Sequence, residues 1–572
     1  MTIQALEGIA ARMTEPSATD AAAETGAPLD AAAAAPATAP RKGGMMRSSA
    51  IYSGLTMISR LMGFARDQVI TIRLGASATI AADCYNTALA FPNLFRRIFA
   101  EGAFATAFVP AYARSLATDG EEVADVLAAD AMATLAAATI VITLVADLAM
   151  PWLMYLINPG YAHDPTKFKL AVTLTQIAMP YLPCMAIYAH LSGVLQARGR
   201  FIVSALAPTL LNLIMLIAVW PQKDAIVAAY AASFAVIIAG IAQAGLLWWG
   251  VRKSGARVDM RLPRLTPEIK RLISLAVPGA IAASATQINI FISGNLASMT
   301  PGGRSWLAVA DRLYQLPLGL VGVAIGVALL PQLSTTVQSG DKQGAQDSMD
   351  EAIALSLAFS LPAAAALVGM PFFLIDALFG HGEFLSYDAH QTAAALFWYG
   401  WGTPAFVLNR ILNQAFFARQ DTKSPMRFGL ISVAVNIVAG VSLFFVMGVA
   451  GIAAATALSA WVNVGQMVTT LVRRGHYLPH RSAVLRLGRI VGASVIMGLA
   501  LAIASFYRPH YQHFFLHRKE IALAFVVMAG GLLYVALMLA LKAVTIAELK
   551  DALRRKPRNS GASGEGVIDV EV

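Results

Sequence analysis

The first two long apolar segments of this chain are AIYSGLTMISRLMGFARDQVITIRLG (Ala50–Gly75) and IAADCYNTALAFPNLFRRIFAEGAFATAFVPAY (Ile80–Tyr112). Each is long enough to cross a membrane. Both nevertheless contain charged residues well inside their apolar runs: Arg60, Arg66, Asp67, Asp83, Arg96, Arg97 and Glu101. A charge at mid-bilayer is costly, so such residues normally face a polar cavity. The two segments therefore predict a cationic cavity inside a bundle of membrane helices.

The composition is that of a polytopic membrane protein. Of 572 residues, 57% are hydrophobic and only 13% are charged, and the mean hydropathy is +0.63. A soluble domain carries roughly a quarter charged residues. The formal net charge of +10 is therefore explained by the positions of Lys and Arg relative to the membrane segments. It gives no reason to expect a nucleic-acid partner.

Further apolar segments of spanning length follow the first two, and together they predict fourteen transmembrane helices. The further segments are Val126–Leu153, Lys169–Gln196, Val203–Trp220, Ala225–Gly250, Leu272–Met299, Trp306–Leu333, Ala352–Met370, Ala393–Phe417, Phe428–Met447, Gly451–Val472, Val484–Phe506 and Ile521–Leu541.

The distribution of basic residues predicts the orientation of these spans. The link between spans six and seven contains Arg252, Lys253, Arg257, Arg261, Arg264, Lys270 and Arg271. The link between spans nine and ten, residues 371–391, has no Lys or Arg. The positive-inside rule then places both termini in the cytoplasm. The pair Arg518 and Lys519, on the predicted outer side, is an exception to this pattern.

Short matches at one offset indicate an internal repeat. FVPAYARSLATDG (Phe108–Gly120) resembles LLPQLSTTVQSGD (Leu329–Asp341), and QARGR resembles FARQD where spans four and ten end. The aligned positions lie 221 residues apart. Six spans separate equivalent positions, so the two copies have the same orientation, as in transporters built from parallel repeats.

The candidate site residues are the arginines of the first spans and Arg312 in the eighth span. Planar guanidinium groups favour two-point binding of phosphate or carboxylate, and several in one cavity suggest a substrate such as a diphosphate. The alternative is structural: arginines that reach the interface, or that pair with nearby carboxylates such as Asp67 and Asp311. Asn289, Asn436 and Asn463 fit either helix packing or an ion site.

No motif in the sequence supports catalysis or a cofactor. The two cysteines, Cys84 and Cys184, form no C-x-x-C or Cys/His cluster, so no metal site is expected. No nucleotide-binding loop G-x-x-x-x-G-K-[ST] occurs, and no catalytic set of Ser, His and Asp is recognisable. The sequence favours a transporter over an enzyme, and no cofactor is expected.

Five motifs are distinctive: SRLMGFARD (Ser59–Asp67), FPNLFRRIFAEGAFATAFVPAY (Phe91–Tyr112), APTLLN (Ala207–Asn212), ADRLYQLPLGLVGVAIGVALLPQLS (Ala310–Ser334) and FFARQDTKSP (Phe416–Pro425). They resemble the MurJ (MviN) lipid II flippases, a family of the multidrug/oligosaccharidyl-lipid/polysaccharide exporter superfamily. The resemblance implies fourteen helices. Twelve form two six-helix lobes related by a pseudo-two-fold axis along the membrane normal, and helices thirteen and fourteen form a lipid groove. It also implies that lipid II, an undecaprenyl-diphosphate disaccharide pentapeptide, is moved from the inner to the outer leaflet for peptidoglycan synthesis.

The resemblance and the spans imply one division of the chain. It comprises a disordered cytoplasmic tail (1–46), the first lobe (47–252), a basic linker (253–271), the second lobe (272–475), helices thirteen and fourteen (476–545) and a cytoplasmic tail (546–572).

The cavity arginines of the family match Arg60, Arg66, Arg96 and Arg312, which are the expected substrate-binding residues, and its acidic positions match Asp67 and Asp83. Gating or charge coupling is expected of Asp67 and Asp83, together with Asp311 and Ser59. Two departures are visible. Gln315 replaces a glutamate found in some members, and the carboxylates of a sodium site reported for some members have no clear match here.

The implied setting is the bacterial cytoplasmic membrane. The expected partners are lipid II, membrane lipids and cell-wall synthesis proteins, and the expected state is a monomer. The alternatives are a flippase for another polyprenyl-linked oligosaccharide and a cation-coupled drug exporter of the same superfamily. A drug exporter would favour an apolar or acidic cavity. A membrane enzyme would need metal-binding Asp pairs or catalytic His residues, and a structural scaffold would not require buried arginines.

Overall fold

The computed structural model describes residues 42–95, 104–511 and 518–543. Within these ranges the chain is helical and contains no β-strand, which confirms the all-α prediction. The chain divides into two compact units, residues 1–54 and 55–572. The interactions described below all belong to the second unit.

The helices follow one another with short connections. They are α2 (Lys42–Leu74), α3 (Ala81–Phe95), α4 (Phe104–Thr118), α5 (Glu121–Ile157), the 3-10 helix η3 (Pro159–His163), α6 (Pro165–Ala178), α7 (Tyr181–Ala197), α8 (Ile202–Val219), α9 (Ala225–Lys253), α10 (Pro267–Ser298), α11 (Gly303–Gln338), α12 (Lys342–Gly369), α13 (Pro371–Phe379), α14 (Ser386–Phe417), α15 (Lys423–Met447), α16 (Val449–Arg473), α17 (Arg481–Phe506), α18 (Arg508–Tyr511) and α19 (Lys519–Ala540).

Local sequence signals start several of these helices. Asp164 caps α6 by accepting hydrogen bonds from the backbone N–H groups of Thr166 and Lys167, and a proline occupies the first helical position. Thr266 caps α10 in the same way and is also followed by proline. A side-chain oxygen at this position satisfies an N–H group that the helix itself leaves unpaired. These ends could therefore be predicted from the sequence.

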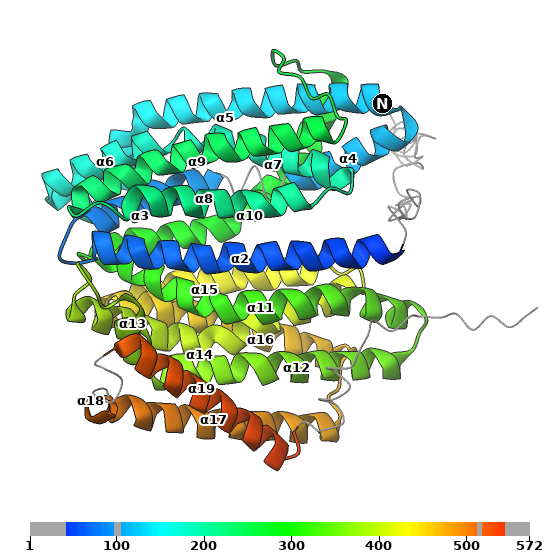
Figure 1. Ribbon diagram of the computed structural model, residues 1–572. Helices are drawn as coiled ribbons and strands as arrows, with labels where there is room; N and C mark the ends of the chain where they lie inside the picture. Colours follow the sequence, from blue (N-terminus) through cyan, green and yellow to red (C-terminus); the bar gives the residue numbers. More distant parts are fainter. Residues whose placement is uncertain (1–41, 96–103, 512–517, 544–572) are drawn as a thin grey trace, which may run out of the picture. The chain divides into compact units, whose positions relative to one another are not determined.

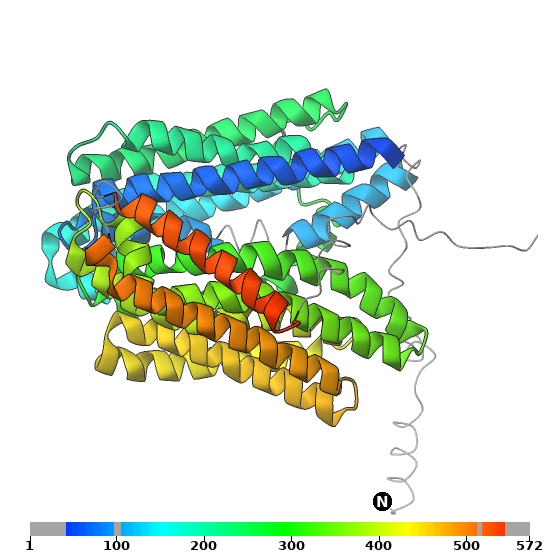
Figure 2. The same ribbon diagram turned by 60° about the horizontal axis from the view of Figure 1, so that its bottom comes forward.

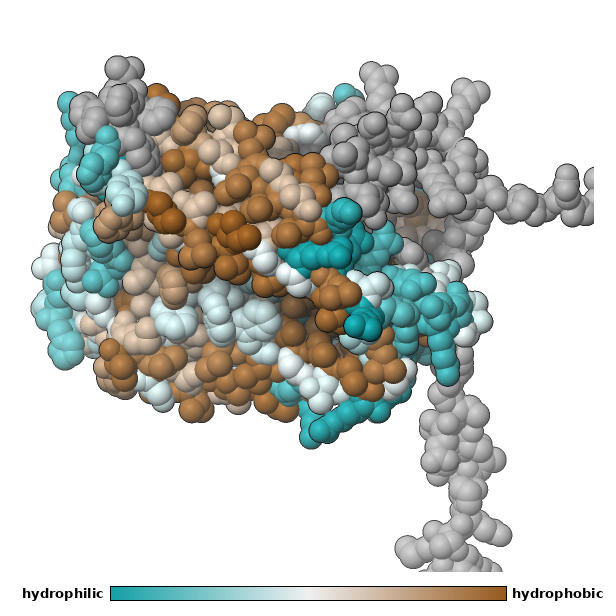
Figure 3. Space-filling model, turned by 90° about the horizontal axis from the view of Figure 1, so that it is seen from below, coloured by the Kyte–Doolittle hydropathy of each residue, from teal (hydrophilic) through white to brown (hydrophobic). Residues whose placement is uncertain are grey.

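The described helices form a membrane protein with many spans. A helix occupies the described part of every apolar segment expected from the sequence. Nine helical segments in the described ranges are long and apolar enough to cross a membrane, by length and composition alone. Figure 3 shows a broad apolar surface bordered by hydrophilic residues at both ends, which is the pattern that a bilayer requires.

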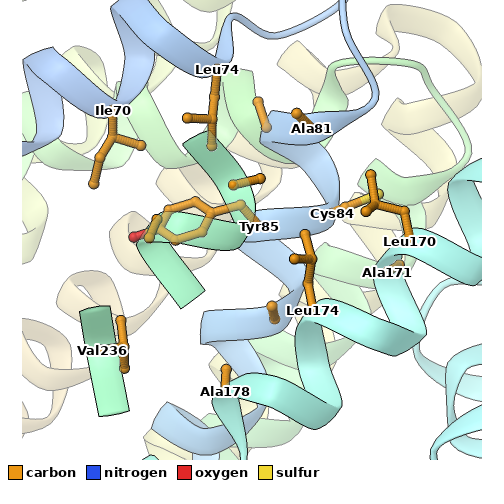
Figure 4. Packing of buried hydrophobic residues seen from close by; sticks show 14 of the residues in the cluster. Ile70, Leu74, Ala81, Cys84, Tyr85, Leu170, Ala171, Leu174, Ala178 and Val236 are labelled. Atoms are coloured by element: carbon orange, nitrogen blue, oxygen red, sulfur yellow. The ribbon is translucent and has the colours of Figure 1, made fainter. Parts of the chain in front are cut away.

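The helices pack in two groups. The first group is α3–α9 and the second group is α11–α16, and the helices of each group contact mainly one another (Figure 1). Helix α10 contacts both groups. The first group has its own apolar core, in which Leu74, Tyr85 and Leu174 interdigitate between α2, α3 and α6 (Figure 4). The second group has a separate core built around α11, α12, α14 and α16.

Helices α17 and α19 lie against each other on the outside of the second group and contact α12 and α13 (Figure 2). Their shared end is held by one buried carboxylate. Asp376 of α13 accepts Arg508 Nη1 at 2.9 Å and Lys519 Nζ at 2.8 Å. Arg508 also stacks over the Phe372 ring, 5.0 Å from its centroid. Lys519, an exception to the charge pattern, therefore lies beside an acidic partner that neutralises it.

Replacing Asp376 by Asn should loosen this attachment. Arg508 and Lys519 would lose their shared counter-charge while remaining partly buried, so we expect the stability to fall by about 1–3 kcal/mol. Thermal unfolding of the purified protein measures this change. Glu520→Gln is the matched control, because its partner His381 lies 3.1 Å away in a half-exposed pair. That variant should lose less than about 1 kcal/mol. Equal losses in both variants would contradict the assignment.

Candidate functional site

Three charged residues meet where α2 passes α11. Asp67 Oδ1 accepts Arg66 Nη2 at 2.7 Å and Nε at 3.0 Å, and Asp67 Oδ2 accepts Arg312 Nε at 3.0 Å. The side chains of Arg66 and Asp67 are 14% and 17% exposed, whereas that of Arg312 is 52% exposed. One carboxylate is therefore shared by two guanidinium groups, and the trio keeps a net charge of +1.

An amide from α8 completes the environment of Arg66. Asn212 Oδ1 accepts Arg66 Nη1 at 2.9 Å, and Asn212 Nδ2 donates to the Ser59 carbonyl oxygen at 2.9 Å. The amide therefore ties the Arg66 side chain to the backbone of its own helix about two turns earlier. An arginine whose donors are engaged on two sides has a fixed plane, which favours two-point recognition of an anion.

A small cavity lies beside the trio. Its volume is about 80 Å³, and its lining includes Arg66, Asp67, Tyr85, Asn86, Ser305 and Arg312. Pockets that enclose small molecules are usually larger, about 300–1,000 Å³. The walls come from α2 and α3 on one side and from α11 on the other. Widening the cavity thus requires movement between the two helix groups.

A buried carboxylate binds Ser305, one of the residues that line this cavity. Asp83 of α3 is fully buried and accepts the backbone N–H groups of Gly302 and Ser305 at 2.8 and 3.1 Å. It also accepts Ser305 Oγ at 2.9 Å and Lys167 Nζ at 2.7 Å. Asp83 therefore caps the first turn of α11, a helix of the other group. The positive end of the helix dipole and the lysine together stabilise its negative charge.

A second buried carboxylate, near Asp83, makes a contact from the second group back to the connection before α3. Asp388 of α14 is fully buried and accepts the Ser77 backbone N–H at 3.0 Å and Trp306 Nε1 at 2.9 Å. Ser77 belongs to the connection between α2 and α3, so each group supplies an acid that binds backbone N–H groups of the other.

Two glycine-containing loops interlock beside these acids. The Glu383 N–H donates to the Ile72 carbonyl at 3.0 Å. Gly75 has φ +70°, and a Cβ atom there would lie 2.6 Å from the Glu383 carbonyl oxygen. Gly382 has φ +61°, and its Cβ would lie 2.5 Å from the Ile72 carbonyl oxygen. Only glycine allows this conformation and this approach together.

The structure brings together part of the expected site. Arg66, Asp67 and Arg312 form one cluster, and Asp83 binds Ser305, which lines the same cavity. Arg312 pairs with Asp67 instead of with its neighbour Asp311, whose carboxylate accepts a hydrogen bond from Gln315. Arg60 is an exposed residue of the same helix, with Gly63 between it and the cluster; α2 continues through both positions as one helix. Arg96, Arg97 and Glu101 lie outside the described residues.

Three participating residues were not anticipated from the sequence. Asn212 stood in a quoted motif, but nothing in that motif indicated a contact with an arginine 146 positions earlier. Lys167 and Asp388 lie in the first turns of α6 and α14, just outside the apolar segments that the sequence predicts, where a charge usually reaches solvent. In the described part of the chain, no group of three or more His, Cys, Asp or Glu residues could hold a metal ion.

Comparison with protein families gives one match over most of the chain. The sequence profile described as "Lipid II flippase MurJ" matches residues 72–520. The chain is 37% identical over 530 residues to "Probable lipid II flippase MurJ" of Rhizobium meliloti, covering 91% of this chain and 98% of the relative. It is 40% identical over 450 residues to the protein of the same name from Rhizobium tropici, covering 78% and 84%.

Comparison with solved structures supports the same fold. The structure titled "Lipid II flippase MurJ, inward closed conformation" superposes with a TM-score of 0.69 at 22% identity, covering 85% of this chain and 97% of that one. An inward-facing multidrug resistance MATE family transporter of the MOP superfamily gives a TM-score of 0.58 at 13% identity, with 77% and 98% covered.

Asp83→Asn should destabilise the closed end strongly. An amide nitrogen would face Lys167 Nζ and backbone N–H donors, so one buried donor would oppose another, and we expect a loss of about 2–4 kcal/mol. Asp224→Asn is the matched control, because Asp224 also caps a helix, accepting the Val227 N–H at 2.9 Å, but in an exposed position. Asn caps helices about as well as Asp, so the control should change by less than about 0.5 kcal/mol. Thermal unfolding of both variants measures the difference, and equal values would contradict the role of Asp83.

Proposed function

The chain belongs to the lipid II flippase MurJ family, and we propose on that premise that it moves lipid II from the inner to the outer leaflet of a bacterial cytoplasmic membrane. The observation that carries the proposal is the pair Arg66 and Arg312, held on one carboxylate beside a cavity between two helix groups. A cationic site inside a membrane bundle suits a substrate whose polar part is a diphosphate.

Asp67 shows how Arg66 and Arg312 bind an oxyanion, which is what a phosphate group of the substrate is in this proposal. It holds the two guanidinium groups within 3.0 Å of its oxygens, from two different helices. A diphosphate carries more negative charge and more acceptor oxygens than one carboxylate does. It can therefore engage the donors that Asp67 leaves free, on Arg312 above all, whose side chain is half exposed. Arg60 and Arg96 are further phosphate-binding residues in this proposal, while Asp311 and Ser59 contribute to charge coupling.

Two six-helix lobes related by an axis along the membrane normal provide the moving parts. The internal repeat seen in the sequence recurs in the helix boundaries: three pairs of helices begin at positions 221 residues apart. The pairs are α5 and α12, α6 and α14, and α8 and α15. Gly199 and Gln420, also 221 residues apart, both have positive φ where α7 and α14 end. This agreement supports two copies of one unit with the same orientation.

Alternating access follows from how the two ends of the cavity are held. The end near Asp83 and Asp388 is held by hydrogen bonds in both directions: Asp83 caps α11, and Asp388 accepts the Ser77 N–H of the α2–α3 connection. In the proposed orientation, with both termini cytoplasmic, this is the outer end. The cavity is then closed toward the outer side of the membrane. Release to the outer leaflet then requires Asp83 to leave the first turn of α11 and Asp388 to leave Ser77, while the polyprenyl chain stays in lipid beside α17 and α19.

The energy source is a gradient or the consumption of product. No nucleotide-binding loop occurs in the sequence. A membrane potential contributes about 2.3 kcal/mol per charge per 100 mV. That energy is sufficient to bias a transition in which a positively charged cavity changes its exposure.

The cationic charge of the site argues against the rival transporter of the same superfamily. An exporter of cationic drugs would place a net negative or apolar surface in the cavity, whereas Arg66, Arg312 and Asp67 leave a net charge of +1. A flippase for another polyprenyl-diphosphate oligosaccharide would use the same phosphate contacts. Lipid II is favoured because the family profile covers residues 72–520.

Replacing Arg66 and Arg312 together by Ala should trap lipid II in the inner leaflet of cells depleted of the native protein. Each arginine contributes a charge-assisted contact of about 1.5–3 kcal/mol, so two losses reduce binding more than a hundredfold. Outer-leaflet lipid II and membrane protein level are measured together. Arg73→Ala is the control on the same helix, because Arg73 is bound to the Trp220 carbonyl at 2.7 Å, outside the cavity. Normal transport by the double variant would refute the site.

Replacing Arg66 or Arg312 singly by Lys separates two-point phosphate binding from simple attraction. Lysine keeps the charge but lacks the planar pair of donors. We expect lipid II affinity to fall at least about tenfold in either variant, at both low and high salt. Affinities are measured with purified proteins in one detergent, and Arg73→Lys serves as control. Equal affinity of all variants would mean that the cavity attracts anions by its field alone.

A further inference from the structure

The connection between α9 and α10, residues 256–266, has no regular secondary structure but is fixed at both ends. Ala256 and Val258 are buried in a core with α4, α5 and α7, and the Arg257 backbone N–H donates to Asp125 Oδ2 at 2.6 Å. Ile269 and Leu272, at the start of α10, belong to the same core. The residues between these two anchors are therefore held in place.

Between the anchors lies a stretch of exposed residues, 259–265, called here the interfacial segment. Three of its side chains are large and apolar: Met260, Leu262 and Leu265 are 76%, 82% and 63% exposed. Burying such a side chain is worth about 1.5–3 kcal/mol. A fixed loop that leaves three of them uncovered is suited to surroundings that are themselves partly apolar.

The charges around the interfacial segment are mostly basic. Residues 252–271 contain seven Lys or Arg and two acids, Asp259 and Glu268. Arg261 and Arg264 alternate with the exposed apolar side chains and are themselves exposed. This pattern of long basic and apolar side chains matches a layer that offers phosphate groups above acyl chains.

Tryptophans place this end of α9 at the border of the membrane. Lys253 Nζ lies 4.8 Å from the centroid of the Trp249 ring, and the Arg252 guanidinium lies 5.5 Å from that of Trp248. Tryptophan is enriched at the headgroup level of membrane proteins. In Figure 1 the connection from α9 to α10 stands out on the side of the first group, next to α5. The two tryptophans at the end of α9 favour headgroup depth for the segment that follows them.

We infer that the interfacial segment binds anionic lipid headgroups. Arg261 and Arg264 contact lipid phosphates, and Met260, Leu262 and Leu265 enter the upper acyl region. The leaflet concerned is the cytoplasmic one, and only this assignment rests on the proposed function. Because the segment is anchored to the first group, its binding holds that group in the leaflet while the second group moves.

A fluorescent label on Leu262→Cys tests this inference in the full-length protein. The unsubstituted protein supplies the background, because its own cysteines are buried or half buried. The protein is placed in phosphatidylcholine vesicles with increasing phosphatidylglycerol, and either lipid carries bromine as a quencher. Brominated phosphatidylglycerol should quench the label more than brominated phosphatidylcholine at equal mole fraction. Arg261→Gln should raise the phosphatidylglycerol fraction at half-maximal quenching about fivefold, which corresponds to about 1 kcal/mol per basic residue.

A label on Ser339→Cys, in the exposed turn between α11 and α12, is the matched control and should show no preference between the two lipids. Equal quenching of the Leu262→Cys label by both lipids, or by neither, would overturn the inference. So would a preference that survives in the Arg261→Gln and Arg264→Gln double variant. Lipid II affinity of the same preparations separates the two proposals: its absence would refute the transport proposal alone, since the anionic-lipid preference is measured without lipid II.

Discussion

The sharing of Asp67 between Arg66 and Arg312 constrains everything around it. Charges inside a membrane bundle persist only when they face one another or water, because an isolated one is costly in hydrocarbon. Here α2 supplies one cation and the anion, and α11 supplies the second cation. The two helices must therefore stay within a salt bridge's reach in this conformation, which keeps the walls of the cavity close together.

At the closed end, buried carboxylates are paired with backbone N–H groups in place of guanidinium groups. Asp83 is fully buried, and a helix N-terminus, a serine hydroxyl and Lys167 surround its carboxyl group. Asp388, from the second group, accepts hydrogen bonds from the Ser77 backbone N–H and from Trp306 Nε1. These contacts are hydrogen bonds and one ion pair, and they stand beside a buried apolar cluster that includes Ala76, Trp306 and Phe384. Polar and apolar contacts together therefore hold this end closed.

Outside the cavity, fixed attachments hold the flanking elements. Asp376 fastens α17 and α19 to the second group, and Asp125 fastens the connection after α9 to the first group. Each attachment uses a buried carboxylate to satisfy donors at a point where the chain leaves regular structure. The flanking elements consequently belong to one group or the other, and the movement that alternating access would require falls to the interface that contains Arg66 and Arg312.

The sequence alone determined the all-helical membrane class, because apolar segments of spanning length have few other folds, and it determined the cationic site, because charges in such segments need a polar cavity. The motif around Arg66 and Asp67 also pointed to the correct family. Only the tertiary structure decided which charges meet. Arg312 might equally have paired with its neighbour Asp311, and nothing local distinguished that choice from Asp67. Lys167, Asn212 and Asp388 acquire their roles through helices that are distant in sequence, since a polar side chain is assigned a partner only when packing brings the two together.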